Sequence, residues 1–285
     1  MAPTLLPAAV PLLILGGGFQ DRHSWSRLER RIGHLHPLLI PDLPPAHPPD
    51  GPQLTWADLT QAALQTVDHS GLGHFAALGG SSGYPIAYRL AQQHPDRVTH
   101  VLLFGASPRP ATSLTALIDD AIHQRALPVE RPARTADPGL PPAASQLQDT
   151  ARDQAARGLV DILTNARAGR ECVPIRAAAR ILRTQLATAP YDPIARYISD
   201  RGRLLLDAPL PEGRINNVRG LVGVGEHDTV TTIGDNRAVA ATIDDVTFTV
   251  VRDADHLLHL EQDAEFANIV TRFLTNRALL PAQST

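Results

Sequence analysis

The chain has 285 residues, 43 % of them hydrophobic and 19 % charged, which is enough for one large folded domain or two small ones and excludes a disordered chain. The net charge is −3, and all 26 basic residues are arginine, so we expect no nucleic-acid or membrane partner and no chemistry that needs a lysine amine. The single cysteine, Cys172, excludes an internal disulfide and fits a reducing compartment.

The first apolar segment runs from Leu5 to Leu15 and could be mistaken for a signal peptide. No positive charge precedes Arg22, two prolines interrupt the segment, and it is too short to span a bilayer. We therefore expect its second half to form a buried strand, and we expect the protein to be cytoplasmic.

Short apolar segments then alternate with amphipathic ones along the chain. The expected strands are Leu12–Leu15, Leu38–Ile40, Phe75–Leu78, Val98–Phe104, Leu221–Val224 and Thr247–Val251. The expected helices lie near 24–33, 54–69, 84–94, 233–243 and 262–276. Apolar strands that alternate with helices predict an α/β fold with a doubly wound, mostly parallel sheet covered on both faces.

One block breaks this alternation. No strand pattern occurs between Ala106 and Arg214, where helices are expected near 112–126, 144–168, 171–189 and 194–207. Five prolines make residues 128–142 an expected loop. The sequence thus predicts a core formed by residues 1–105 and 215–285, with a helical cap, or lid, formed by residues 106–214.

The strongest chemical signal is Gly79-Gly80-Ser81-Ser82-Gly83, which stands directly between an expected strand and an expected helix. Gly-x-Ser-x-Gly in this position is typical of a nucleophile elbow, in which a tight turn presents a serine hydroxyl at the carboxyl end of the sheet. Glycines two residues before and after the serine avoid collisions with neighbouring backbone. Ser81 is the candidate nucleophile; the alternative is a Gly/Ser turn without chemistry.

A serine nucleophile needs a base, and the base needs an orienting acid. Asp228 follows the strand Leu221–Val224 and is the candidate acid, with Glu226 as a rival two residues earlier. Asp253 and Asp255 are further rivals because they flank the candidate base.

His256 is the candidate base because it follows the strand Thr247–Val251 on the loop that leads to the last helix. His259 and His227 are its rivals. The twelve histidines show no spacing typical of a metal site, so we expect no metal.

An oxyanion formed at Ser81 needs two backbone N–H donors. Ser82 is one candidate, and the loop Gly16–Gln20 after the first strand supplies the other. A phosphate-binding loop is the alternative for these glycines, but the pattern G-x-G-x-x-G is absent.

At this point the chain resembles the α/β-hydrolase superfamily. The resemblance covers most of residues 10–108 and 218–276, and it is carried by the segments LLILGGGFQDRHSW, HPLLIPDLP, HFAALGGSSGYPIAYRLAQQHPDRVTHVLLFGASP, LVGVGEHDTV and DADHLLHLEQDAEFANIVTRFL. It implies Ser81, Asp228 and His256 as the catalytic triad. It also implies Gly18 and Ser82 as oxyanion donors, with Phe19 as the fallback for Gly18.

Two departures from the family pattern matter. Gly16-Gly17 stands where family members usually have His-Gly, and too few residues precede Leu12 for the antiparallel hairpin that normally opens the sheet. We therefore expect about six strands. Phe19 and Tyr84 are candidates for substrate contact.

These observations favour a serine hydrolase that cleaves an ester or thioester without a cofactor. The substrate is expected to be a small molecule, with an acyl thioester bound to a carrier as one form. The alternatives are an acyl-transferring macrocyclase and a non-hydrolytic cyclase or ligand receptor that uses the same pocket. The oligomeric state does not follow from the sequence.

Overall fold

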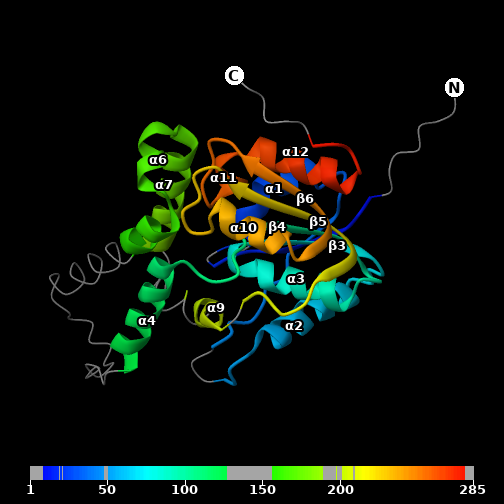
Figure 1. Ribbon diagram of the computed structural model, residues 1–285, viewed down its shortest axis with the longest axis horizontal. Coiled ribbons are helices and arrows are strands. Elements are labelled where there is room, and N and C mark those ends of the chain that lie inside the picture. Colours follow the sequence, from blue (N-terminus) through cyan, green and yellow to red (C-terminus); the bar gives the residue numbers. More distant parts are fainter. Residues whose placement is uncertain are drawn as a thin grey trace, which may run out of the picture.

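The computed structural model describes residues 9–18, 20, 22–47, 51–126, 156–188, 197, 201–207 and 209–279. In this part of the chain six strands form one parallel sheet with helices on both faces (Figure 1). The strands are β1 (Leu12–Leu15), β2 (Leu38–Leu39), β3 (Phe75–Gly80), β4 (Val98–Phe104), β5 (Ile215–Gly225) and β6 (Ile243–Val251). The α/β fold with a parallel sheet is confirmed.

The strand order is β2-β1-β3-β4-β5-β6, with every neighbouring pair parallel. The chain passes from β1 outward to β2 and then returns to the other side of β1 to form β3. The connections after β1 and β3 therefore diverge, and the carboxyl ends of these two strands flank a crevice. Leu15 pairs with Gly79 there, so the glycine loop after β1 lies beside the turn that follows β3.

Helices cover both faces of the sheet (Figure 1). On one face lie α1 (Ser26–Ile32) and α12 (Asp263–Leu274), while α2 (Trp56–His69), α3 (Tyr84–Gln93) and α10 (Ile233–Ala240) lie on the other. The remaining described helices are η1 (Arg22–Trp25), η2 (Ser81–Gly83), α4 (Thr112–Ala126), a helix over 156–163, α6 (Ala166–Glu171), α7 (Val173–Thr188), α9 (Arg203–Leu206) and α11 (Leu258–Glu261).

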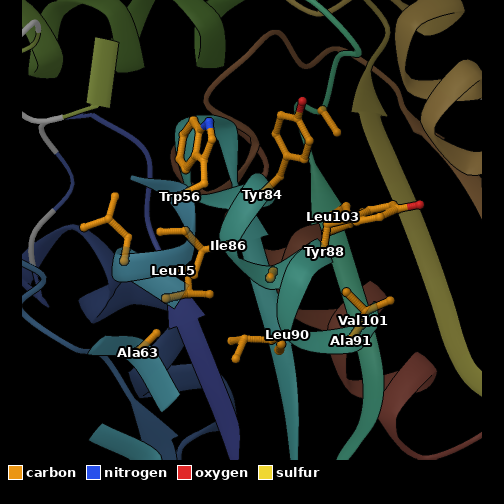
Figure 2. Close-up of a cluster of buried hydrophobic side chains, with 14 of the residues drawn as sticks. Leu15, Trp56, Ala63, Tyr84, Ile86, Tyr88, Leu90, Ala91, Val101 and Leu103 are labelled. Carbon is orange, nitrogen blue, oxygen red and sulfur yellow. The ribbon is translucent and has the colours of Figure 1, made fainter. Parts of the chain in front are cut away.

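Figure 2 shows the hydrophobic core beneath α2 and α3, where their buried side chains meet β1 and β4. Tyr88 packs here with its hydroxyl group donating to Thr242 Oγ1 at 2.9 Å. Trp56 donates from its ring nitrogen to the carbonyl of Leu204 in α9, at 3.2 Å. The core under α2 is therefore tied directly to the last described helix of the expected cap.

The described parts of residues 106–214 are mainly helical and contain no strand, as expected. The helix expected over 144–168 is interrupted: within the described residues one helix ends at 163 and α6 begins at Ala166. The proline-rich loop 128–142 lies outside the described residues. The division into a core and a cap stays a prediction. Among the described residues, no helix combines the length and the apolar character that crossing a membrane requires.

Candidate active site

Ser81 occupies a strained turn between β3 and α3. Its φ angle is +48°, in the left-handed region that non-glycine residues rarely adopt. The flanking glycines show why the turn needs this sequence. A Cβ atom on Gly79 would lie 2.5 Å from Tyr84 Cα, and one on Gly83 would lie 2.0 Å from the carbonyl oxygen of Leu15. Both positions therefore require glycine, because β1, β3 and α3 approach one another so closely.

The three residues predicted as a triad come together at the carboxyl edge of the sheet. Ser81 Oγ lies 2.9 Å from His256 Nε2, and His256 Nδ1 lies 2.9 Å from Asp228 Oδ2. Asp228 and His256 are only 6 % and 7 % exposed. An ionised carboxylate can only accept hydrogen bonds, so His256 donates from Nδ1 and leaves Nε2 free to accept the proton of Ser81.

Asp228 is held by several donors. Its Oδ1 accepts from the backbone N–H groups of Val230 and Thr231 at 2.9 and 2.8 Å, and its Oδ2 accepts from the Thr231 hydroxyl at 2.8 Å. Burial opposes ionisation of this carboxyl, but His256 and these donors keep its pKa below the ordinary value. Asp228 is therefore ionised and fixed in orientation at neutral pH.

The pKa of His256 is raised. Burial alone would lower this pKa, but the charge of Asp228 and the hydrogen bond to it outweigh burial. The nearby carboxyl groups of Asp255 and Glu261 act in the same direction. The imidazole thus gains basicity from a partner that also fixes its tautomer.

The glycine loop after β1 contacts Ser81. A Cβ atom on Gly17 would lie 2.7 Å from Ser81 Cβ. The Gly17 N–H donates to Gln20 Oε1 at 2.8 Å, while the Gly18 N–H has no hydrogen-bond partner within the described part of the chain. Arg201 donates to the carbonyl of Gly16 at 2.8 Å and fixes the start of the loop.

Ser82, the second residue predicted as an oxyanion donor, is buried at the start of the turn that leads into α3. The first N–H groups of a helix lack partners within the helix, so this position suits a backbone donor. Phe19, the fallback donor and a candidate for substrate contact, lies outside the described residues.

Two small cavities, of about 40 and 30 Å³, meet at Ser81. Leu163 and Tyr197 line both of them. The first also contains Gln20, Ser24, Gln185 and His259; the second contains Tyr84, Leu114, Leu205 and Val230. Tyr84, a predicted substrate contact, lines the second cavity, and its hydroxyl group donates to the carbonyl of Ser107.

A second buried group of titratable side chains lies behind His256. Glu261 Oε2 accepts from the Asp255 N–H at 2.6 Å. Burial raises the pKa of Asp255 to about 6 and that of Glu261 to about 7. His259 stacks on Trp25 with ring centroids 4.5 Å apart, and burial lowers its pKa to about 3. His259 is therefore neutral, and it contacts neither Ser81 nor Asp228 by a hydrogen bond in the described structure.

Asn165 was not singled out from the sequence, although it links the helical insertion to both the acid and the base. Its side-chain amide donates to the carbonyl of His227 at 2.9 Å, and its backbone N–H donates to Asp255 Oδ2. These two acceptors immediately precede Asp228 and His256. Asn165 also caps α6 by accepting from the Ala168 N–H at 3.0 Å. An asparagine inside an expected helix was the available signal, because asparagine favours the cap of a helix over its interior.

The rival acids lie elsewhere. Glu226 is exposed and accepts from the Asp253 N–H at 3.3 Å. Glu226, His227 and Asp253 each offer one metal-ligand atom within 4.8 Å of the others. Such exposed acidic groups are common without an ion, and we assign no metal to them.

A sequence model of the alpha/beta hydrolase family matches residues 12–269, and the chain belongs to this family. No curated protein sequence gives a significant match.

Solved structures with the same fold include an esterase from Thermogutta terrifontis (18 % identity, TM-score 0.69, covering 94 % of this chain and 90 % of that one). They also include an enol-lactonase from Burkholderia xenovorans (21 %, 0.66, 94 % and 92 %) and a meta-cleavage product hydrolase from Pseudomonas fluorescens (16 %, 0.68, 95 % and 92 %). At these identities the likeness concerns the fold.

Proposed function

We propose that this protein is a serine hydrolase that cleaves a carboxylic ester or thioester through an acyl-enzyme on Ser81. The observation that carries the proposal is the buried hydrogen-bonded chain from Ser81 through His256 to Asp228. Membership of the alpha/beta hydrolase family supports hydrolase activity. The similar solved structures, an esterase, a lactonase and a meta-cleavage product hydrolase, support the same general class.

The mechanism follows from the donors and acceptors. His256 Nε2 takes the proton of Ser81 as Oγ attacks the substrate carbonyl, and Asp228 stabilises the imidazolium that forms. The N–H groups of Gly18 and Ser82 would hold the oxyanion of the tetrahedral intermediate. His256 then protonates the departing oxygen or sulfur, which leaves the acyl group on Ser81.

Hydrolysis of the acyl-enzyme repeats these steps with water. Water enters where the alcohol or thiol has left, and His256 Nε2 removes its proton during attack on the acyl carbonyl. Collapse of the second tetrahedral intermediate returns the proton to Ser81 Oγ and releases the acid.

The lining of the two cavities favours a neutral substrate with two short arms. Among the described lining residues there is no arginine, aspartate or glutamate, so neither cavity offers a counter-charge. Both cavities are mostly apolar. The cavity with Tyr84 has aliphatic side chains from Leu114, Leu205 and Val230, and the other cavity has the amide and hydroxyl groups of Gln20, Ser24 and Gln185. We infer that one arm is aliphatic and the other carries uncharged polar groups.

Fluorophosphonate labelling tests the covalent step. Labelling of the wild-type protein and its loss in Ser81→Ala would support it, and an unlabelled wild-type protein would contradict it. A panel of neutral and carboxylate-bearing esters and thioesters then tests the substrate class, with neutral substrates expected to react fastest. Mass spectrometry of the products separates hydrolysis from acyl transfer to an internal hydroxyl or amine, because only hydrolysis releases the free acid.

A further inference from the structure

The helical insertion contains a third hollow that is separate from the two at Ser81. It has a volume of about 470 Å³ and lies between the helix over 156–163, α6 and α7. In Figure 1, α6 and α7 lie together at one side of the molecule. No described residue lines both this hollow and a cavity at Ser81. Its volume lies within the range of ordinary small-molecule sites, roughly 300–1,000 Å³.

Arginines from all three helices line this hollow, which we call the arginine groove. They are Arg157, Arg170, Arg176, Arg180 and Arg183, and Asp161 is the only carboxylate among the described lining residues. The groove is therefore positively charged, although the whole chain carries a net charge of −3.

Three of these arginines, Arg176, Arg180 and Arg183, stand at helical spacing on α7 and therefore share one face. Within the described part of the chain, no ion pair neutralises them or Arg170. Like charges one turn apart repel each other, and an anion between them removes this repulsion.

One guanidinium is already held in place. Arg176 donates from Nη1 to the carbonyls of Gly169 and Arg170 near the end of α6, at 3.2 and 3.1 Å. A fixed guanidinium loses less conformational entropy when it binds an anion than a mobile one does. Arginine is also the side chain best suited to paired hydrogen bonds with phosphate oxygens.

The rest of the lining combines two polar residues, Thr164 and Asn165, with the apolar residues Val160, Ala166, Ile175 and Ala179 and with Gly169. Val160 and Ile175 are almost fully buried, at 7 % and 1 % exposure, whereas Ala179 is half-buried and Ala166 is exposed, so the two alanines provide the accessible apolar surface. A small inorganic ion would use the arginines and leave this surface uncovered, whereas an organic anion would cover it and gain hydrophobic stabilisation.

We propose that the arginine groove binds an organic phosphate, that is, a phosphate monoester carrying an apolar group. The phosphate lies among the guanidinium groups of α7, and the apolar group lies against Ala166, Ala179 and the exposed edge of Val160. Several unpaired guanidiniums suit the double charge of a phosphate monoester better than the single charge of a carboxylate. This site is independent of the chemistry at Ser81.

The test is calorimetric titration of the full-length Ser81→Ala protein with hexyl phosphate, inorganic phosphate, hexanoate and hexanol. We expect hexyl phosphate to bind at least about tenfold more tightly than inorganic phosphate or hexanoate, because only it satisfies both parts of the groove. Hexanol should give no measurable heat. Binding should weaken between about 50 and about 300 mM NaCl, since exposed charges are screened by salt.

Arg180→Gln/Arg183→Gln should weaken hexyl phosphate binding at least about tenfold, since each lost guanidinium removes charge-assisted hydrogen bonds. The matched control is Arg30→Gln/Arg277→Gln, which removes the same charge from exposed positions elsewhere and should leave binding unchanged. The arginines of both pairs are exposed, so both variants should keep the wild-type melting temperature.

Three results would overturn the proposal: no binding of hexyl phosphate at millimolar concentration, equal weakening by both double variants, or equal affinity for hexyl phosphate and inorganic phosphate. Because the titration uses a protein without Ser81, its outcome does not depend on whether Ser81 forms an acyl-enzyme. A negative fluorophosphonate result would not contradict ligand binding in the arginine groove. A negative titration would not contradict the proposed hydrolysis at Ser81.

Discussion

Alanine substitution of the three glycines around Ser81 gives a graded test of the elbow. A Cβ atom on Gly83 would lie 2.0 Å from the carbonyl oxygen of Leu15 and 2.7 Å from that of Gly16. Both neighbours are backbone atoms, so no side-chain rotation relieves the collision. Real Cβ atoms essentially never approach closer than 3.0 Å, so β1 and the turn must separate by about 1 Å.

This separation moves the glycine loop away from Ser81, because Gly16 begins that loop. A misplacement of about 1 Å at a reacting centre lowers the rate by on the order of 10²-fold. Overpacking of a rigid core costs about 1–3 kcal/mol, which lowers the melting temperature by about 5 °C. Gly79→Ala should behave similarly, since its Cβ would lie 2.5 Å from Tyr84 Cα.

Gly80→Ala is the internal control. Its Cβ would meet the Trp25 ring at 3.5 Å, an ordinary contact, and its φ of −106° suits any residue. We expect this variant to keep the wild-type melting temperature and close to the wild-type kcat/KM for a short neutral ester. Fluorophosphonate labelling rates and thermal melts of the three variants test whether the collisions at Gly79 and Gly83 disturb the site. The steric argument is wrong if Gly83→Ala labels and melts like Gly80→Ala.

Three further changes probe the site. Ser81→Ala and His256→Ala should each lower kcat by at least about 10³-fold, because the triad acts as a unit, and Ser81→Ala should keep the wild-type melting temperature; kcat within about tenfold of wild type in Ser81→Ala would exclude the covalent mechanism. Asn165→Ala removes a helix cap and the donor to the His227 carbonyl, so we expect a loss of about 1–3 kcal/mol in unfolding free energy and a lower kcat with little change in KM. Asn165→Asp keeps the capping oxygen and should recover the part of the stability that the cap contributes but not kcat, and equal kcat in both variants and wild type would show that Asn165 serves only the helix. Glu261→Gln tests the raised pKa of about 7: the folded state holds a proton there that the unfolded chain loses near pH 4.5, so the unfolding free energy falls as pH rises between these values, and the substitution should remove this fall. Thermal melts from about pH 4.5 to about pH 8 measure the difference, which a pH-independent gap between variant and wild type would contradict.

The sequence predicted the bounds of β1 to β4 better than those of β5 and β6. The strands at the centre are apolar and buried on both sides, so their pattern is plain. β5 and β6 each begin earlier than expected, at Ile215 and Ile243. The first part of β5 carries polar residues, a register shift and a left-handed Asn217, while β6 is a half-exposed edge strand. An apolar pattern does not reveal such segments.

The candidate triad could be predicted because each member stands directly after a strand, where the parallel sheet brings all three loops to one edge. The contacts of Asn165 and Arg201 could not. Each joins the insertion to a loop that is distant in sequence, and their formation depends on how the helices dock on the sheet. Helix propensity describes a segment by itself and says nothing about its docking.

The links made by Asn165 and Arg201 limit how the insertion can be exchanged in protein engineering. Leu163, Leu182 and Gln185 shape the cavities and can vary with the substrate. Asn165 and Arg201 instead hold backbone groups of the core, at His227 and Gly16. A chimera that receives a foreign insertion should therefore keep an amide and a guanidinium at these two places, even if every residue that touches the substrate is replaced. The same two positions would be the fixed points if related chains acquired new specificities by recombination.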